Sequence, residues 1–132
     1  MEKVTCKVFD FNNPNRRLNI PKETFQKALD EYLSSKNQKL GELDPSPEDP
    51  FINLSRVSHK IEDMRIENDE VIADIQLLDT LNGKLAQKLI KLGNNLHFEP
   101  RMIGECIYET DESGNKKMVD VEHLQIISID IV

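Results

Sequence analysis

Apolar and polar residues alternate along several stretches of this chain, which is the pattern of strands with one buried face. In the clearest stretch, residues 71–78, the apolar face consists of Val71, Ala73, Ile75 and Leu77. Further strands are predicted at residues 3–11, 51–59 with an extended continuation to 66, 101–108 and 118–132. The alternation in the last strand slips between Ile126 and Ile127, which fits a β-bulge.

Two other stretches have the 3.6-residue period of amphipathic helices. Pro21 opens the first helix, at a position where a missing N–H has no cost. Its apolar face consists of Phe25, Ala28, Leu29, Tyr32 and Leu33. The second helix has candidate N-caps in Thr80 and Asn82, and Gly93 ends it. Its apolar residues on one face are Leu85, Leu89 and Leu92.

The segments between these elements are rich in turn residues. Turns are predicted at residues 12–15, 67–70 and 111–115, and the three prolines of residues 41–50 predict a loop. Because most strands are joined by short turns, the sheet should be mainly antiparallel, with the helices packed on it. We therefore predict one α+β domain over residues 1–132, either a small mainly antiparallel β-barrel or a curved sheet, with about two peripheral helices.

Composition and charge exclude several classes of function. The 132-residue chain has a net charge of -7, with 24 acidic and 17 basic residues interspersed, so nucleic-acid binding is not expected. It has neither an apolar run of the ~20 residues that span a bilayer nor a signal-type core near Met1. Cys6 and Cys106 form no Cys-x-x-Cys pair and are expected to be half-buried thiols in a reducing compartment. These features predict a soluble intracellular protein without a membrane partner.

The histidines do not suggest a metal centre. His59, His97 and His123 lack the close spacing of metal ligands, so we expect no metal site and no cofactor. Cys106 lies in a predicted strand with no specific partner, and a role as nucleophile is not favoured.

Four ordered blocks of this sequence resemble the prohead (capsid-maturation) protease family of tailed bacteriophages, over roughly residues 17–132. The blocks are Leu18–Pro21 with the helix that follows, Gly41–Asp44 with Ile52–Ile61, Val71–Leu78 with Asp79–Gly83, and Arg101–Gly104 with Ile129–Val132. The resemblance implies a small β-barrel with peripheral helices, related to herpesvirus assembly proteases. In that family a serine nucleophile and a histidine base cleave scaffold and capsid proteins, commonly after glutamate.

The sequence departs from the family at both catalytic positions. Where the family has its histidine, Asp44 is followed by Pro45–Ser46. Where the family has serines, Arg101 is preceded by Glu99–Pro100. Proline cannot act as a general base, and neither glutamate nor proline replaces a serine in acyl transfer.

The remaining candidate residues follow from the resemblance. Arg101 matches an arginine near the family's oxyanion site, and His59 matches a family histidine that would serve as a third group. Ser58 and His59 are neighbours in a predicted strand, so their side chains should point to opposite faces and form no dyad. The candidate catalytic residues are His59, Ser46 and Arg101. The candidate binding residues are Asp44, His59, His97, Glu99 and Arg101, with Glu99 either mimicking a substrate glutamate or capping a strand.

Three hypotheses of function remain. The first is an inactive protease-like phage protein that binds a head, core or scaffold protein during capsid assembly. The second is an active, divergent serine peptidase that uses Ser46 or Ser128 with His59. The third is a small phage-encoded inhibitor or regulator of a host enzyme, for which the small size and acidic charge are suited. All three place the protein in the host cytoplasm or within the prohead or virion, with a protein partner, and leave a homodimer open.

Overall fold

The computed structural model describes residues 2–13 and 19–132, so Pro14, Asn15 and Leu18 of the predicted turn and first block lie outside the described residues. Within these ranges the chain forms six strands, two α-helices and one short 3-10 helix. In chain order they are β1 (Lys3–Asp10), α1 (Lys22–Ser34), β2 (Leu40–Glu42), η1 (Leu54–Arg56), β3 (Val57–Glu67), β4 (Glu70–Leu77), α2 (Leu81–Lys91), β5 (Phe98–Thr110) and β6 (Lys116–Ile131).

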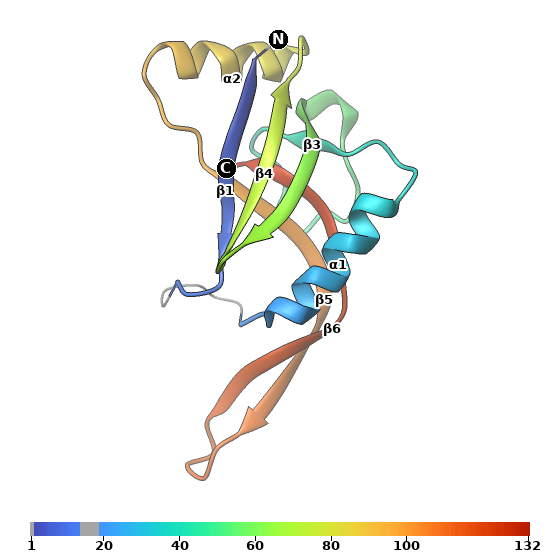
Figure 1. The fold of residues 1–132 in the computed structure, drawn as a ribbon, viewed down its shortest axis with the longest axis vertical. Coiled ribbons are helices and arrows are strands. Elements are labelled where there is room, and N and C mark those ends of the chain that lie inside the picture. The colour runs from blue at the N-terminus through green and yellow to red at the C-terminus, as the bar shows by residue number, and fades with distance from the viewer. Residues whose placement is uncertain (1, 14–18) are drawn as a thin grey trace.

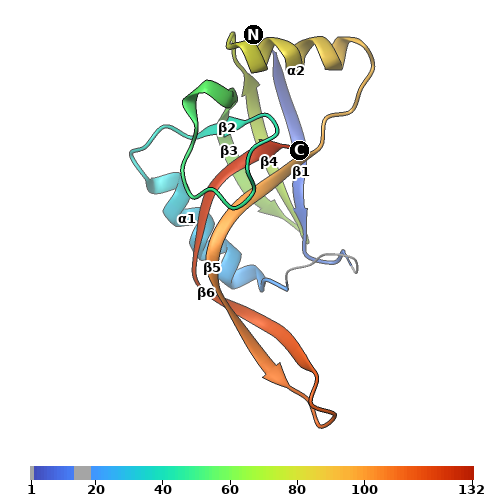
Figure 2. The same cartoon turned by 180° about the vertical axis from the view of Figure 1, so that it is seen from behind.

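The strands form two antiparallel sheets, as the short connections predict. The larger sheet has the order β1-β4-β3-β2, and the smaller consists of β5 and β6. Figures 1 and 2 show β5 and β6 crossing beside the larger sheet and then projecting beyond it as a long hairpin. The two sheets do not close into a barrel. The fold is therefore α+β with a curved sheet, which is the second of the two predicted shapes.

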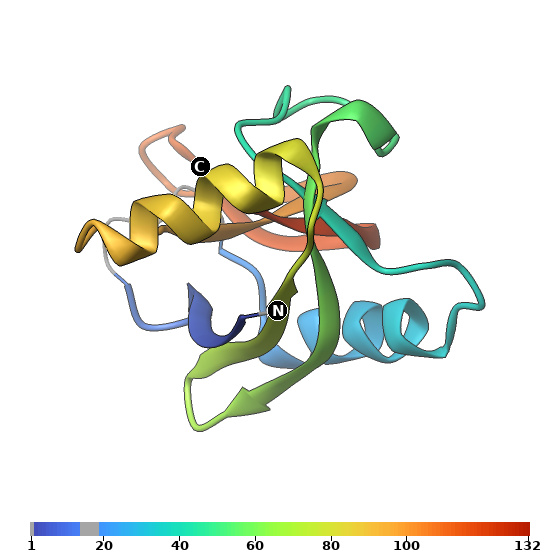
Figure 3. The same cartoon turned by 90° about the horizontal axis from the view of Figure 1, so that it is seen from above.

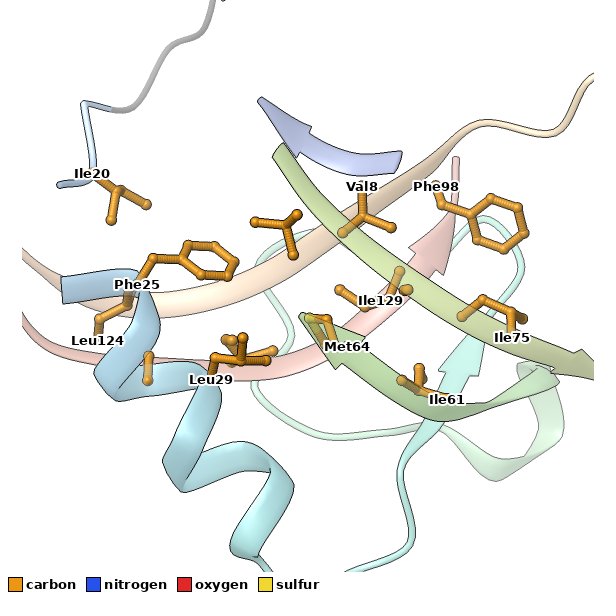
Figure 4. Close-up of a cluster of buried hydrophobic side chains, with 14 of the residues drawn as sticks. Val8, Ile20, Phe25, Leu29, Ile61, Met64, Ile75, Phe98, Leu124 and Ile129 are labelled. Carbon is orange, nitrogen blue, oxygen red and sulfur yellow. The ribbon is translucent and has the colours of Figure 1, made fainter. Parts of the chain in front are cut away.

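The hydrophobic core lies between the larger sheet, α1 and the body half of β6 (Figure 4). β4 supplies the predicted alternating face, whose residues are at most 1% exposed and are Val71, Ala73, Ile75 and Leu77. The helix α1 buries Phe25, Ala28 and Leu29, the inner part of its predicted apolar face. Each fully buried large apolar side chain contributes about 1.5–3 kcal/mol, so this packing holds α1 beside β6.

The strand β6 is bent by irregularities in its pairing with β5. Arg101 pairs with Ser128 and Met102 with Ile126, so Ile127 is an extra residue on β6. The predicted bulge is thereby confirmed. A second register shift lies near His123, which has a positive φ of 53°. Bulges of this kind bend a strand and increase its local twist, and here they direct the β5–β6 hairpin away from the body of the domain.

The helix α2 buries small residues and exposes large ones. Thr80 is its N-cap, because its Oγ1 accepts from the Gly83 N–H at 3.0 Å, and Gly93 follows its end with a φ of 89°. The buried residues are Gly83 and Ala86, whereas Leu85 and Leu92 are 46% and 71% exposed. The leucine face is therefore not the core face. A Cβ at Gly83 would lie 2.0 Å from Leu78 O, so only glycine permits this close approach. Figure 3 shows α2 lying across the end of the sheet.

Two segments before β3 differ from the prediction. The start of the predicted loop is a strand, because β2 includes Gly41 and Glu42 and pairs with β3. Residues 51–56, predicted as strand, form a bend and the 3-10 helix η1 instead. The cause is local: the Asn53 side chain accepts from the N–H of Ser55 at 3.1 Å, and this cap favours a helical turn over an extended chain.

Candidate functional site

Buried polar side chains gather around Arg101. This residue lies on β5 opposite Ser128 on β6, and its side chain is 4% exposed. Its Nη2 donates to Glu42 Oε2 at 2.6 Å, and its Nε lies 3.0 Å from Asp130 Oδ2. Three strands, β2, β5 and β6, thus place one guanidinium between two carboxylates. We refer to Glu42, Arg101, Ser128 and Asp130 as the arginine cluster.

Within the arginine cluster, Asp130 is held from several sides. Ser128 and Asp130 are two residues apart on β6 and share one face of the strand, and Ser128 Oγ donates to the Asp130 carboxylate at 2.9 Å. The Glu42 N–H donates to Asp130 Oδ1 at 3.0 Å. Burial raises the pKa of Asp130, and the charge of Glu42 adds to this, although hydrogen bonds from Glu42 N and Ser128 and the charge of Arg101 act in the opposite direction. The positive charge of Arg101 is therefore required to offset the negative charge of this buried carboxylate.

Arg101 also ties a surface loop to the sheet. Its Nη1 donates to the carbonyl oxygens of Asp49 and Phe51 at 3.2 and 3.4 Å. Arginine has five N–H donors. Here the Nε, Nη1 and Nη2 groups all face acceptors of the chain itself. The arrangement can clamp the loop, but it directs no N–H toward the oxygen of a bound substrate.

His59 is buried on β3 with both ring nitrogens in use. Nε2 lies 2.6 Å from Ile129 O, and Nδ1 lies 2.8 Å from Ser58 Oγ. Because a carbonyl only accepts, Nε2 carries the proton and Nδ1 accepts from the Ser58 hydroxyl. Burial lowers the pKa of His59 to about 4, and the bond to Ile129 O offsets this in part. A Cβ at Gly41 would lie 2.0 Å from Nε2, so this glycine makes the room for the ring.

The expectation that Ser58 and His59 do not meet is wrong. Their backbones alternate as in any strand, but the short Ser58 side chain reaches the neighbouring ring nitrogen. Both residues have 0% exposure, so the pair has no contact with solvent. A serine–histidine hydrogen bond therefore exists in this chain, in the interior and with a neutral histidine.

The two segments at which the sequence departs from the pattern of the resembling family flank the end of β6. On one side, the Asp44 N–H donates to Ile131 O at 2.8 Å, immediately before Pro45. On the other side, Glu99 and Pro100 pair with Asp130 and Ile129. The fold thus brings together the two segments that the sequence singles out, although they lie more than fifty residues apart.

The other predicted binding residues lie on the surface. The side chain of Asp44 is 93% exposed, and its Oδ2 lies 3.8 Å from Arg56 Nη2. His97 and Glu99 are exposed and contact each other at 2.9 Å. Ser46 is exposed in the loop after β2. Of the predicted residues, the structure therefore places Arg101 and His59 in the interior and the others outside.

The two cysteines differ in their surroundings. Cys6 is partly buried, and this burial, together with the charge of Asp74, raises its pKa to about 12. Cys106 is exposed on β5, so the expectation of a half-buried thiol is wrong for this residue. Both are free thiols.

The sequence interpretation missed the partners of Arg101. It named Glu42 and Asp130 only as parts of the resembling blocks, and Ser128 only as a possible nucleophile. A signal was present, because Ser128 and Asp130 occupy alternate positions in an otherwise apolar strand end, where polar side chains need a buried partner. The identity of that partner depends on pairing between distant strands.

Metal-binding and membrane-spanning features can be assessed only for residues 2–13 and 19–132. In these ranges no group of three or more histidine, cysteine, aspartate or glutamate side chains is placed to hold a metal ion. Neither helix there is long and apolar enough to cross a membrane.

The fold is that of a prohead-protease-like domain. The chain is similar to the capsid assembly protease gp21 of bacteriophage T4, with a TM-score of 0.80 and 23% sequence identity, over 98% of this chain and 80% of that protease. No protein-family model and no curated protein matches the sequence. The resemblance found in the four sequence blocks thus has a counterpart in the three-dimensional arrangement of the whole chain.

Proposed function

We propose that this protein is a catalytically inactive relative of phage capsid-assembly proteases that acts by binding a protein partner during head assembly. The observation that carries the proposal is the state of Arg101. It matches the arginine near the family's oxyanion site, yet its donors are bonded to Glu42, Asp130, Ser128 and the loop carbonyls. With Glu99–Pro100 before it, the segment has no serine nucleophile, and the Arg101 side chain directs no N–H toward a developing oxyanion.

The alternative of an active peptidase receives less support from the geometry. Ser128 Oγ is bonded to Asp130 and Arg101, and both ring nitrogens of His59 are bonded to Ser58 and Ile129. Ser46 is exposed, whereas His59 is buried, and His97, the other histidine considered as its base, contacts Glu99. A general base must reach the proton that it removes, and neither pair meets this condition.

The partner class follows from the likeness to a capsid assembly protease. We take the partner to be a head or scaffold protein, because a fold can be kept for binding after the chemistry of its site is lost. The protein would act in the host cytoplasm, in the prohead or in the virion. An inhibitor of a host enzyme remains the competing class, and no contact within the structure favours it.

Labelling with a serine-reactive fluorophosphonate tests the proposal. We expect no covalent adduct on the intact chain by mass spectrometry, under conditions that label an active serine protease included in the same sample. A stoichiometric adduct on Ser46, Ser58 or Ser128 would contradict the proposal. Substitution of the labelled serine with alanine would then identify the nucleophile.

A further inference from the structure

The outward face of α2 is apolar. Leu81, Leu85 and Leu92 are 84%, 46% and 71% exposed. Because they are spaced four and seven residues apart, they form one stripe along the helix and its C-cap. The buried residues Gly83 and Ala86 lie on the other side of the helix, which packs on β3 and β4. Large apolar side chains that are exposed together in this way mark a contact surface.

Three lysines flank the leucine stripe. Lys84, Lys88 and Lys91 are spaced four and three residues apart and form a second row along α2. This row borders the leucine stripe, because Lys88 lies three residues after Leu85 and four before Leu92. The helix has no acidic residue, and none of the salt bridges among the described residues includes these lysines. In a chain with a net charge of -7, α2 thus offers a basic and apolar surface, which selects an acidic and apolar partner.

An acidic and apolar surface lies on the projecting β5–β6 hairpin. Alternate residues of β5 share one face of the strand, and here they are Ile103, Glu105, Ile107 and Glu109. Ile103 is 40% exposed, and both glutamates are exposed. Glu122 of β6 pairs with Glu105 and adds a further exposed carboxylate to the same face. We refer to this surface as the acidic hairpin face.

The acidic hairpin face has negative charges that its own strands do not balance. Glu105 and Glu122 are directly opposite each other in the antiparallel pairing, and like charges at such positions are destabilising. Among the described residues, no salt bridge or other electrostatic contact includes either side chain, whereas Glu109 lies opposite Lys117. A row of lysines from another molecule would remove this repulsion.

The two complementary surfaces lie too far apart to meet within one chain. Figures 1 and 2 show α2 at one end of the long axis of the molecule and the hairpin at the other. Their charged rows have similar lengths. Lys84 and Lys91 are about 10 Å apart along a helix that rises ~1.5 Å per residue, and Glu105 and Glu109 are about 13 Å apart along a strand that rises ~3.3 Å per residue. A contact between two copies of the chain therefore fits both surfaces.

We propose that α2 of one copy of this chain docks on the acidic hairpin face of the next copy. The leucine stripe packs against Ile103 and Ile107, and the lysine row pairs with Glu105 and Glu122. Because the two surfaces differ, the contact is heterologous, and the copies associate head to tail into a ring or an open chain. The inference goes beyond the proposed function, since it does not depend on whether the chain cleaves peptides.

Sedimentation equilibrium of the intact chain, between about 1 and 300 μM, measures this association, because contacts of micromolar affinity form in that range. We expect the average molar mass to rise with concentration above the 15.2 kDa of one chain. Lys84→Glu with Lys88→Glu should shift the association at least about tenfold to higher concentration, because like charges then face each other. Glu105→Lys with Glu122→Lys should do the same, and it keeps a like-charge pair in the hairpin. A mixture of the two variants should associate again, because each then meets a surface of opposite charge.

The control variant is Lys27→Glu with Lys36→Glu. It changes the net charge by the same amount as the α2 variant, at exposed lysines outside both surfaces, and should associate like the unchanged chain. The proposal is overturned if the intact chain stays monomeric, if the control loses association as the α2 variant does, or if the mixture of the two reversed variants does not associate. Each of these results would leave the fluorophosphonate test of the proposed function unaffected.

Discussion

The arginine cluster and the α1–β6 groove adjoin the same strand, and they differ in how their polar groups are satisfied. At the end of β6, Arg101 is bonded to Glu42, Ser128 and Asp130, and every group has its partner within the chain. Along the preceding residues, which line a groove of about 880 Å³ together with α1, no described strand pairs with the outer edge of β6, and no described residue bonds to Tyr32 Oη. The region that resembles the protease family in sequence thus has its polar side chains bonded to one another within the chain. The groove, in contrast, keeps polar main-chain groups of β6 that no described strand bonds.

Removal of the charge of Arg101 should have the largest effect on stability. Arg101→Met leaves two buried carboxylates without their guanidinium, and we expect the free energy of unfolding to fall by about 3–5 kcal/mol. Urea unfolding followed by circular dichroism measures it. Arg65→Met is the control, because Arg65 likewise pairs with acidic residues, three instead of two, but on the surface. Its effect should stay below about 1 kcal/mol. Equal losses in both variants would mean that the cluster is not an internal clamp.

The burial of His59 predicts a dependence of stability on pH. Its folded-state pKa of about 4 lies below the usual 6.5, so the unfolded chain takes up the proton first as the pH falls. Stability is therefore complete above pH 6.5 and is lost between pH 6.5 and 4, by about 3 kcal/mol. The raised pKa of Asp130 acts with the opposite sign toward low pH.

The contribution of His59 to this pH dependence can be measured by comparing variants. Unfolding in urea at pH 7.5 and 4.5 should show a smaller pH effect in His59→Asn than in the unchanged chain. His123→Asn, at an exposed histidine, should keep the full pH effect. A titration of His59 near pH 6.5, observed by NMR, would contradict the buried neutral ring.

The hydroxyl of Ser128 should contribute less to the free energy of unfolding than the charge of Arg101 does. Ser128→Ala removes a donor to Asp130 and an acceptor for Arg101, while the ion pair between them remains. We expect a loss of about 1–3 kcal/mol by the same unfolding measurement. Ser55→Ala, at an exposed serine, serves as the control. An unchanged midpoint for Ser128→Ala would show that the serine only fills space.

The smallest effect on the free energy of unfolding is expected for a substitution in the groove between α1 and β6. Gln125 is exposed, lines the groove and pairs with Ile103 of β5. Gln125→Ala should change the free energy of unfolding by no more than about 0.5 kcal/mol, because its side chain bonds to no described residue. A loss comparable to that of Ser128→Ala would indicate that the groove is structural, and the contrast with the arginine cluster would disappear.

Much of the fold could be predicted because its elements have strong local patterns. The structure contains the strand predicted by the alternation from Val71 to Leu77 and the helix predicted by the apolar face of α1. It also contains the bulge predicted by the break in alternation at Ile127. Closure of the sheet could not be predicted, since it depends on whether β5 and β6 pair with the larger sheet. The bend and 3-10 helix after Phe51 were also missed, because the capping bond of Asn53 overrides the β-propensity of its neighbours.

The candidate site was predicted in part, and the missing part depends on distant contacts. The sequence singled out Arg101 and His59 but not Glu42 and Asp130, because β2, β5 and β6 must assemble before the side chains of the arginine cluster meet. The same dependence on distant contacts explains why the buried face of α2 could not be predicted. Its leucines suggest a buried face, but the close approach of the helix to Leu78 O admits only the side of Gly83 and Ala86.

Peptide turnover tests the central claim, a protease-like fold without the protease reaction, most directly. The intact chain is incubated with peptides that contain glutamate sites from phage scaffold proteins, and the products are counted by mass spectrometry against a sample without protein. The account predicts no cleavage above that background. Cleavage after glutamate that is lost in Ser46→Ala or Ser128→Ala would contradict it.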